Sequence, residues 1–250
     1  MISRPLAVIS DIHGNRWALE AVLEDIRRRR IQDLVNLGDT VYGPLDPQGT
    51  AEILLDLDVP TVRGNQDRIL LEPADQAAIV PTLAYVLDSL SEAHLEWLRS
   101  LGTTAVVEGK TLLCHASPDC DSEYLLWQLD QGGASLRRAS DVVATLGSIG
   151  NPVVLCGHDH VPRTMLLPNG TLVVNPGSVG LPAYVDDEPF PHVMETGTPH
   201  ARYAVMSEVS GGWRVEDVAV PYDWQTAAAV ALRNGRPDWA EWLQTGQASL

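Results

Sequence analysis

Short apolar runs separated by turn-forming residues recur along the chain, and this pattern is typical of buried β-strands. Runs of this kind predict strands at residues 6–10, 34–37, 61–63, 103–107, 111–114, 153–156, 164–167 and 171–174. Two longer runs, 201–209 and 213–220, flank Ser210-Gly211-Gly212 and predict a hairpin. The pattern therefore predicts a core built mainly from strands.

Helical periodicity, with apolar side chains every three or four positions, fills the segments between the early strands. It predicts helices at residues 17–30, 47–57, 76–90, 92–101, 135–146 and 224–233. Strands alternate with helices in the first third of the chain, whereas strands dominate after Pro152. This mixture predicts an α/β (α+β) fold in which helices pack outside a mixed β core.

The chain shows neither an internal repeat nor a low-complexity linker. Its 250 residues, 45% apolar and 20% charged, therefore predict one domain over residues 1–250, with 221–250 as a C-terminal helical extension. In that extension Trp239, Trp242 and Leu243 are expected to cover the core or to form an oligomer contact, so the oligomeric state stays open. Residues 186–199 are rich in Pro, Asp and Glu and predict a long surface loop.

The formal charge of −16 argues against general nucleic-acid binding and against anionic membrane surfaces, both of which require a basic face. No apolar run approaches the ~20 residues of a transmembrane helix, and the N-terminal run is too short for a signal peptide. Cys114, Cys120 and Cys156 are odd in number and form no CxxC motif, which argues against a disulfide framework. We read Cys114 and Cys156 as small buried hydrophobic residues, and we expect a cytoplasmic protein.

Acids, amides and histidines gather at the C-terminal ends of the predicted strands, often beside a glycine. They are Asp11, His13, Asp39, Asn65, His115, His158 and His160. Ligands collect at such strand ends in α/β proteins. In Asp11-x-His13 and His158-x-His160 the two side chains of each pair can point the same way. These N and O donors suit divalent manganese, iron or zinc, and two such ions can hold a phosphoryl group and activate water.

Five blocks in order resemble the signature of the calcineurin-like metallophosphoesterases: Asp11-x-His13, Gly38-Asp39, Gly64-Asn65-x-Asp67, His115 and Gly157-His158-x-His160. The resemblance covers residues 6–160, and Asn175-Pro176-Gly177-Ser178 is similar to a segment of the small bacterial branch. It implies a four-layer αββα sandwich of two mixed sheets flanked by helices, with the site at one edge.

The resemblance also implies a role for each residue of the site. Asp11, His13 and His160 would hold one metal ion. Asn65, His115 and His158 would hold the other, and Asp39 would bridge both. A metal-bridging hydroxide would then attack phosphorus in line.

Gln66 departs from the family pattern, because many members have at this position a histidine that protonates the leaving oxygen. Glutamine can donate a hydrogen bond but cannot transfer a proton. We therefore expect leaving groups that depart unprotonated, such as the phosphate of an anhydride, a phenolate or a nucleotidic phosphate. His200 and a metal-bound water are alternative proton donors. Asp67 is expected to orient a ligand histidine or a water, so Asn65, Gln66 and Asp67 are the candidate catalytic residues.

The sequence thus predicts a phosphoesterase acting on a small phosphorylated substrate, such as a nucleotide or another ester or anhydride with a good leaving group. A protein phosphatase and a non-catalytic interaction module that retains the fold are the alternatives. The remaining candidates have ordinary structural explanations: His94 and His192 as surface histidines, Arg63 and Arg68 as salt-bridge partners rather than phosphate clamps, and Asp159 as a side chain pointing away from the ligands. Ser178 and the backbone of Gly177 are candidates to border the site.

Overall fold

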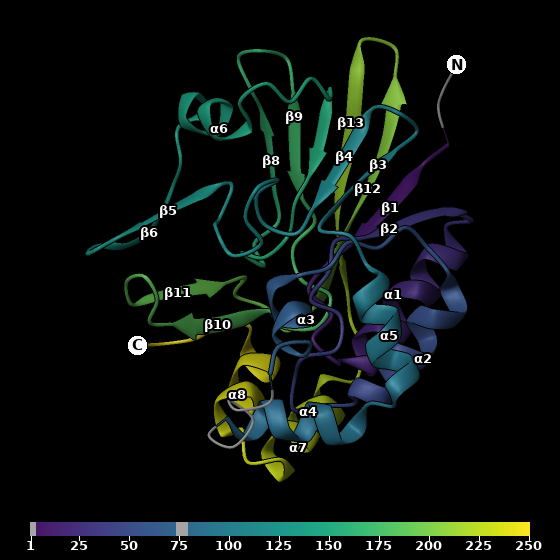
Figure 1. The fold of residues 1–250 in the computed structure, drawn as a ribbon, viewed down its shortest axis with the longest axis vertical. Coiled ribbons are helices and arrows are strands. Elements are labelled where there is room, and N and C mark those ends of the chain that lie inside the picture. Colours follow the sequence, from purple (N-terminus) through teal and green to yellow (C-terminus); the bar gives the residue numbers. More distant parts are fainter. Residues whose placement is uncertain (1–3, 74–79) are drawn as a thin grey trace.

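A computed structural model describes residues 4–73 and 80–250 and shows two large sheets between helices (Figure 1). The first sheet has the order β13-β12-β1-β2, with β1 Leu6–Ile9, β2 Asp33–Asn36, β12 Ala201–Val209 and β13 Gly212–Val220. The second has the order β3-β4-β7-β9-β8, with β3 Thr104–Val107, β4 Thr111–Cys114, β7 Val153–Leu155, β8 Arg163–Leu166 and β9 Leu172–Asn175. Both sheets combine parallel and antiparallel pairs.

The strand residues alternate between two apolar layers, which explains why the runs are continuously hydrophobic. In β1, Val8 joins the core between the sheets, while Ala7 and Ile9 face α1 (Arg16–Arg28). In β4, Leu113 joins the same inter-sheet core, and Leu112 packs with α6 (Ala139–Leu146). Helices therefore cover the outer face of each sheet, and the four-layer αββα sandwich is confirmed.

Local signals determine where the helices begin. Asn15 caps α1 by accepting a hydrogen bond from Ala18 N, and Asp46 caps α2 (Pro47–Leu57) in the same way through Gly49 N. The remaining helices are α3 Asn65–Ile69, α4 Pro81–Ser89, α5 Glu92–Ser100, α7 Trp224–Arg233 and α8 Pro237–Thr245. Within the described residues, no helix is both long enough and apolar enough to span a membrane.

Two small hairpins stand apart from the main sheets (Figure 1). They are β5 Trp127–Asp130 with β6 Gly133–Leu136, and β10 Ala183–Asp186 with β11 His192–Glu195. The helices α7 and α8 pack with β10 in a separate apolar cluster that contains Leu45, Leu181, Trp239, Trp242 and Leu243. The C-terminal tryptophans are therefore buried, as expected.

Four expectations about elements differ from the structure. Residues 186–199 are not one long loop, because His192–Glu195 pairs with Ala183–Asp186. The helix expected from residue 135 begins at Ala139, since Gly133–Leu136 pairs with β5. Residues 61–63 form only the bridge Asn36–Thr61 instead of a strand. The helix expected at 76–90 begins at Pro81, and its residues 76–79 lie outside the described residues.

Candidate metal centre

The loops after β1, β2 and β7 hold their polar residues in an uncommon backbone conformation. Positive φ occurs at Asp11 (54°), His13 (52°), Asp39 (52°), His158 (72°) and His160 (62°), which are five of the eight non-glycine residues in this region of φ among those described. Each residue in this conformation costs of order 1–3 kcal/mol of folding free energy, and the conformation persists only where the surrounding structure imposes it. Such strain concentrates at functional sites, so its clustering here indicates one.

Close backbone contacts impose this conformation. The amides of Ile12 and His13 both donate to the carbonyl of Asp39, at 2.9 and 3.0 Å. Glycines permit the approach: a Cβ at Gly64 would lie 2.1 Å from Asp39 Oδ1, and one at Gly157 would lie 2.7 Å from Asp11 Oδ2. The glycines beside the candidate ligands are therefore required for the loops to meet.

The loops bring the candidate ligands together in two groups, Asp11 with His13 and His160, and Asp39 with His115 and His158. Within each group the ligand atoms lie within 4.8 Å of one another. Asn65 adjoins the second group, since its Oδ1 lies 3.0 Å from His115 Nε2. Asp39 lies between the groups, with Oδ2 3.3 Å from His115 Nε2 and 4.0 Å from His13 Nε2. The arrangement matches the grouping that the resemblance implies.

The histidine tautomers favour cation binding. His13 Nδ1 lies 3.0 Å from the carbonyl of Tyr42, and His160 Nδ1 lies 2.7 Å from that of Leu181. A carbonyl only accepts, so each Nδ1 carries the hydrogen and each Nε2 of the neutral ring presents a lone pair. These two Nε2 atoms lie 3.1 Å apart. Two facing lone pairs are stabilised by a shared cation.

One carboxylate oxygen at the centre is buried and has no hydrogen-bond partner among the described residues. It is Asp11 Oδ1, which lies 3.3 Å from His160 Nε2, while Asp11 Oδ2 accepts from His158 N at 3.0 Å. Leaving such an oxygen unsatisfied is costly. The donor set therefore fits bound divalent cations.

Burial and neighbouring charges shift the pKa values of the group in opposite directions. Burial would raise the pKa of Asp11, but His160, His115 and His13 hold it well below its usual range. Burial would lower the pKa of His115, but Asp39 and Asp11 raise it to about 10. Burial, together with the neighbouring His160, lowers the pKa of His13 to about 4. Asp11 and Asp39 thus stay ionised and His13 stays neutral near pH 7, as binding of a cation requires, whereas His115 has to release its proton when a cation binds.

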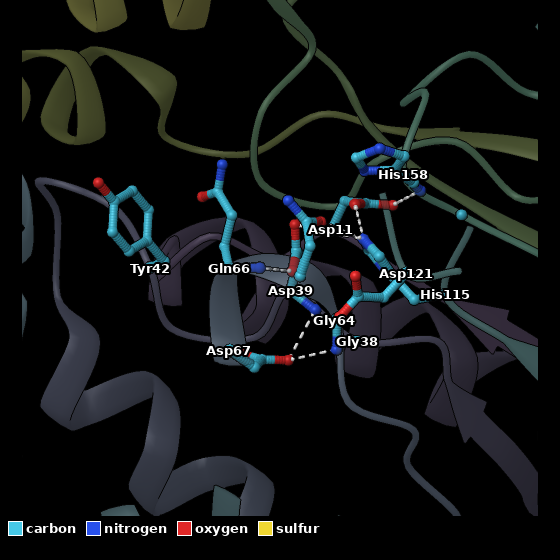
Figure 2. A network of polar contacts seen from close by, with 12 residues as sticks. Asp11, Gly38, Asp39, Tyr42, Gly64, Gln66, Asp67, His115, Asp121 and His158 are labelled. Carbon is cyan, nitrogen blue, oxygen red and sulfur yellow. Dashed lines mark hydrogen bonds and ion pairs between the residues drawn. The ribbon is translucent and has the colours of Figure 1, made fainter. Parts of the chain in front are cut away.

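Asp67 connects two of the ligand loops (Figure 2). Its buried carboxylate accepts from the amides of Asp39 (2.9 Å), Gly64 (3.0 Å) and Thr40 (2.8 Å), and from Thr40 Oγ1 (2.7 Å). Burial and the charge of Asp39 raise its pKa to about 6. Asp67 therefore orients the backbone that carries Asp39, whereas a ligand histidine or a water was expected.

A cavity of about 240 Å³ opens over the centre. Its lining combines candidate ligands with residues from distant elements: His13, Asp39, Tyr42, Asn65, Gln66, Tyr124, His158, His160, Leu181, Tyr184, Val185, Asp186, Arg236, Trp239 and Trp242. Figure 2 shows Gln66 and Tyr42 projecting to the same side, away from Asp67. We call Tyr42, Tyr124, Tyr184, Trp239 and Trp242 the aromatic wall. Sequence reasoning missed its role, because only the fold brings these residues together.

Two histidines expected at the surface are buried instead. His192 is 1% exposed, and its Nε2 lies 2.9 Å from the Tyr124 hydroxyl. His94 is 7% exposed, and its Nδ1 accepts from Ser91 N at the start of α5. His200 packs against Trp224 and is not among the residues that line the cavity, so it is not a proton donor at this site.

Of the other candidates, Arg68 and Asp159 have the structural roles expected of them, but Arg63 and Ser178 do not. Among the described residues Arg63 forms no salt bridge and its buried Nε has no hydrogen-bond partner, and Ser178 does not line the cavity. Arg68 forms salt bridges with Asp121 and Glu72. Asp159 belongs to neither ligand group. Ser178 Oγ donates to the carbonyl of Asp11 at 2.7 Å, so it supports the ligand loop from behind. Cys114 and Cys156 are both buried, as expected.

Known proteins resemble this chain over most of its length. Residues 5–196 match the model of the calcineurin-like phosphoesterase superfamily domain. An uncharacterized protein of Methanocaldococcus jannaschii is 29% identical over 262 residues, covering 96% of each chain. A metallophosphoesterase from Sphaerobacter thermophilus has a similar structure, with a TM-score of 0.76 and 25% identity over 97% of this chain and 100% of that one. A hypothetical protein from Pyrococcus horikoshii OT3 shares the fold, with a TM-score of 0.73 and 21% identity over 98% and 99% of the two chains.

Proposed function

The chain belongs to the calcineurin-like phosphoesterase superfamily, and on that premise we propose that it hydrolyses a small phosphorylated substrate with two bound divalent cations. The observation that carries the proposal is the convergence of two ligand groups on one cavity, around the unpartnered Asp11 Oδ1. Manganese, iron and zinc all suit the N and O donors. Such cations would supply Lewis acidity toward the phosphoryl oxygens and lower the pKa of bound water.

Residues of the chain position the groups that this reaction needs. Asp39 lies between the groups and is held by Gln66 N, which donates to its Oδ1 at 2.9 Å. Asn65 offers a neutral oxygen beside His115. The carboxylate of Asp39 is therefore the one negative charge among these donors of the second group. Gln66 lines the cavity where a proton donor is needed, and its carboxamide cannot transfer a proton. Good leaving groups are therefore favoured.

Hydrolysis of p-nitrophenyl phosphate and bis(p-nitrophenyl) phosphate with added manganese, iron or zinc tests the activity. We expect metal-dependent turnover of at least one ester and its loss in Asp39→Asn. If the metal-loaded protein hydrolyses neither ester and no nucleotide, the proposal fails and a non-catalytic interaction module becomes the better account. Turnover of a phosphopeptide panel in preference to small esters would instead favour a protein phosphatase.

Substitution of Gln66 tests the leaving-group argument separately. General-acid help is worth about 10²–10⁴-fold, so Gln66→His should raise the rate on an alkyl phosphate such as glycerol 2-phosphate far more than the rate on p-nitrophenyl phosphate. Gln66→Asn, which keeps the amide but introduces no acid, is the matched control. Equal effects on both substrates would mean that the residue does not serve the leaving group.

A further inference from the structure

Apart from histidines, the cavity over the metal centre contains one basic side chain among the residues that the structure describes. That residue is Arg236, at the N-cap of α8, and its neighbours in the cavity include the acidic Asp39 and Asp186. The whole chain carries a formal charge of −16, so its overall field repels anions. The positive charge of Arg236 in the cavity therefore contrasts with the negative charge of the molecule as a whole.

Arg236 is held rigidly by its neighbours. Its Nε and Nη2 donate to the carboxylate of Asp238, at 2.9 and 2.6 Å, and its Nη1 donates to Thr82 Oγ1 at 2.8 Å. A guanidinium has five N–H groups, and these bonds engage three of them. The side chain is 30% exposed, so the other N–H groups are accessible to a ligand.

The aromatic wall places this guanidinium near the metal ligands. Its central carbon lies 5.4 Å from the ring centroid of Trp239, and that ring lies 6.0 Å from the ring of His13. Arg236 and His13, a candidate ligand of the first group, thus both lie close to the ring of Trp239. Trp239 and Trp242 are only 4% and 9% exposed, so their faces are covered and offer little area for stacking a nucleobase.

Gln66 and Tyr42 complete this part of the cavity. Gln66 Oε1 is buried and has no hydrogen-bond partner within the described part of the chain. Tyr42 is half-buried, and its side chain projects to the same side as that of Gln66 (Figure 2). The Gln66 oxygen only accepts, but its Nε2 and the Tyr42 hydroxyl can both donate to a ligand in the cavity that Arg236 also lines. Three donors, one of them charged, suit a phosphate better than an aryl group.

We infer that Arg236, with Gln66 and Tyr42, binds a second phosphate of the substrate, and that the substrate class is therefore a phosphoanhydride. The inference rests on the proposed function, since it requires a phosphoryl group at the metal centre. Two phosphorus atoms that share one bridging oxygen would occupy the centre and the Arg236 subsite together.

The reaction balances without a proton donor at Gln66. A water oxygen bonds to the phosphorus at the centre, and the bridging P–O bond breaks with its electron pair remaining on the leaving phosphate. The water's protons pass to the product phosphates or to solvent. A phosphate leaves as a stable anion because its second pKa is about 6. Arg236 stabilises that anion as it forms.

Arg236→Gln tests the subsite, and Arg233→Gln is its control, because Arg233 is exposed on α7 and the exchange removes the same charge. With ADP and inorganic pyrophosphate at fixed free manganese, Arg236→Gln should lower kcat/KM by about 10- to 100-fold, the range for a charged hydrogen bond. For p-nitrophenyl phosphate, which lacks a second phosphate, KM and kcat should stay within about twofold. Arg233→Gln should change none of these values.

If anhydrides are hydrolysed too slowly for kinetic measurement, inhibition by an anhydride analogue tests the same subsite. Imidodiphosphate should inhibit p-nitrophenyl phosphate hydrolysis more strongly than phosphate does in the wild type, and this difference should disappear in Arg236→Gln. If Arg236→Gln does not fold, Arg236→Lys replaces it, because lysine keeps the charge but loses the planar fork.

Three results would overturn the inference: equal losses on both substrate types, no selective change in a folded variant, or no hydrolysis and no inhibition by anhydrides. Each of these can occur while p-nitrophenyl phosphate is still hydrolysed, and the proposed function would then stand. Loss of all esterase activity from the wild type would refute the proposed function itself.

Discussion

The ligand loops and the aromatic wall enclose the same cavity but are held in place by different means. The loops after β1, β2 and β7 hold their side chains through left-handed backbone and amide–carbonyl contacts. The wall is positioned by side-chain packing. For example, Trp239 and Trp242 belong to one apolar cluster with Leu45 and Leu181. A change in a ligand loop therefore disturbs the backbone, whereas a change in the wall can be absorbed locally. We expect chemistry to depend on the loops and substrate choice to depend on the wall.

The largest effect is expected where the loops approach most closely. Gly64→Ala would place a Cβ 2.1 Å from Asp39 Oδ1 and 2.5 Å from Asp39 N, so the backbone must shift. Activity should fall by more than about 100-fold, since loss of an outer-shell partner alone costs about 10–100-fold. Turnover of p-nitrophenyl phosphate measures this. Gly150→Ala is the matched control, because its Cβ would meet nothing within 4 Å.

The next effect concerns the carboxylate that connects two ligand loops. Asp67→Asn replaces an acceptor of four hydrogen bonds with a group that has one oxygen and an NH₂ facing other donors. An unsatisfied buried group costs about 1–3 kcal/mol, and we expect the free energy of unfolding to drop by about 3 kcal/mol. Urea unfolding of the metal-free protein measures this loss. Asp88→Asn, on the exposed side of α4, should have almost none.

A change in the wall should be milder and should leave metal binding intact. The Tyr184 hydroxyl donates to the carbonyl of His158 at 3.2 Å and contacts Tyr124. Tyr184→Phe should lower the free energy of unfolding by about 1 kcal/mol, the worth of one hydrogen bond, with unchanged metal content. If this variant loses its metal, the distinction between loops and wall is wrong.

The smallest effect is the pH dependence of the Arg68–Asp121 pair. Burial would raise the pKa of Asp121, but the hydrogen bond from Arg68 lowers it below the ordinary aspartate value of 3.8. A lowered pKa means that this stabilisation is fully present above 3.8 and is lost as the pH falls through the folded-state pKa. Arg68 is 38% exposed, so screening limits the pair to about 0.5 kcal/mol. Arg68→Gln should therefore lower the Tm slightly at pH 7, and the difference should shrink below pH 3.8.

The same contrast explains how much the sequence predicted. The candidate ligand positions follow short local blocks, such as Asp11-x-His13 at the end of a strand, and strand ends of parallel sheets meet. The helices 47–57 and 224–233 have the predicted bounds, because Asp46 and Asp223 cap them locally. Local chemistry was enough for these features.

The wall and its supporting hairpin could not be predicted in this way. His192 lies in a segment rich in Pro, Asp and Glu, and its burial depends on Tyr124, which is 68 residues away. The strand His192–Glu195 has only four residues, too few for a clear alternation. Arg236 has the local pattern of a surface helix start, and only the packing of α8 brings it to the cavity. Long-range packing determined these positions.

Elemental analysis of the purified protein, before and after reconstitution with manganese, tests the central claim most directly. The two ligand groups predict about two metal ions per chain in the reconstituted protein. Asp39→Asn should retain fewer, because Asp39 lies between the groups. Reconstituted protein that binds no metal, or an Asp39→Asn variant with the full wild-type content, would contradict the account.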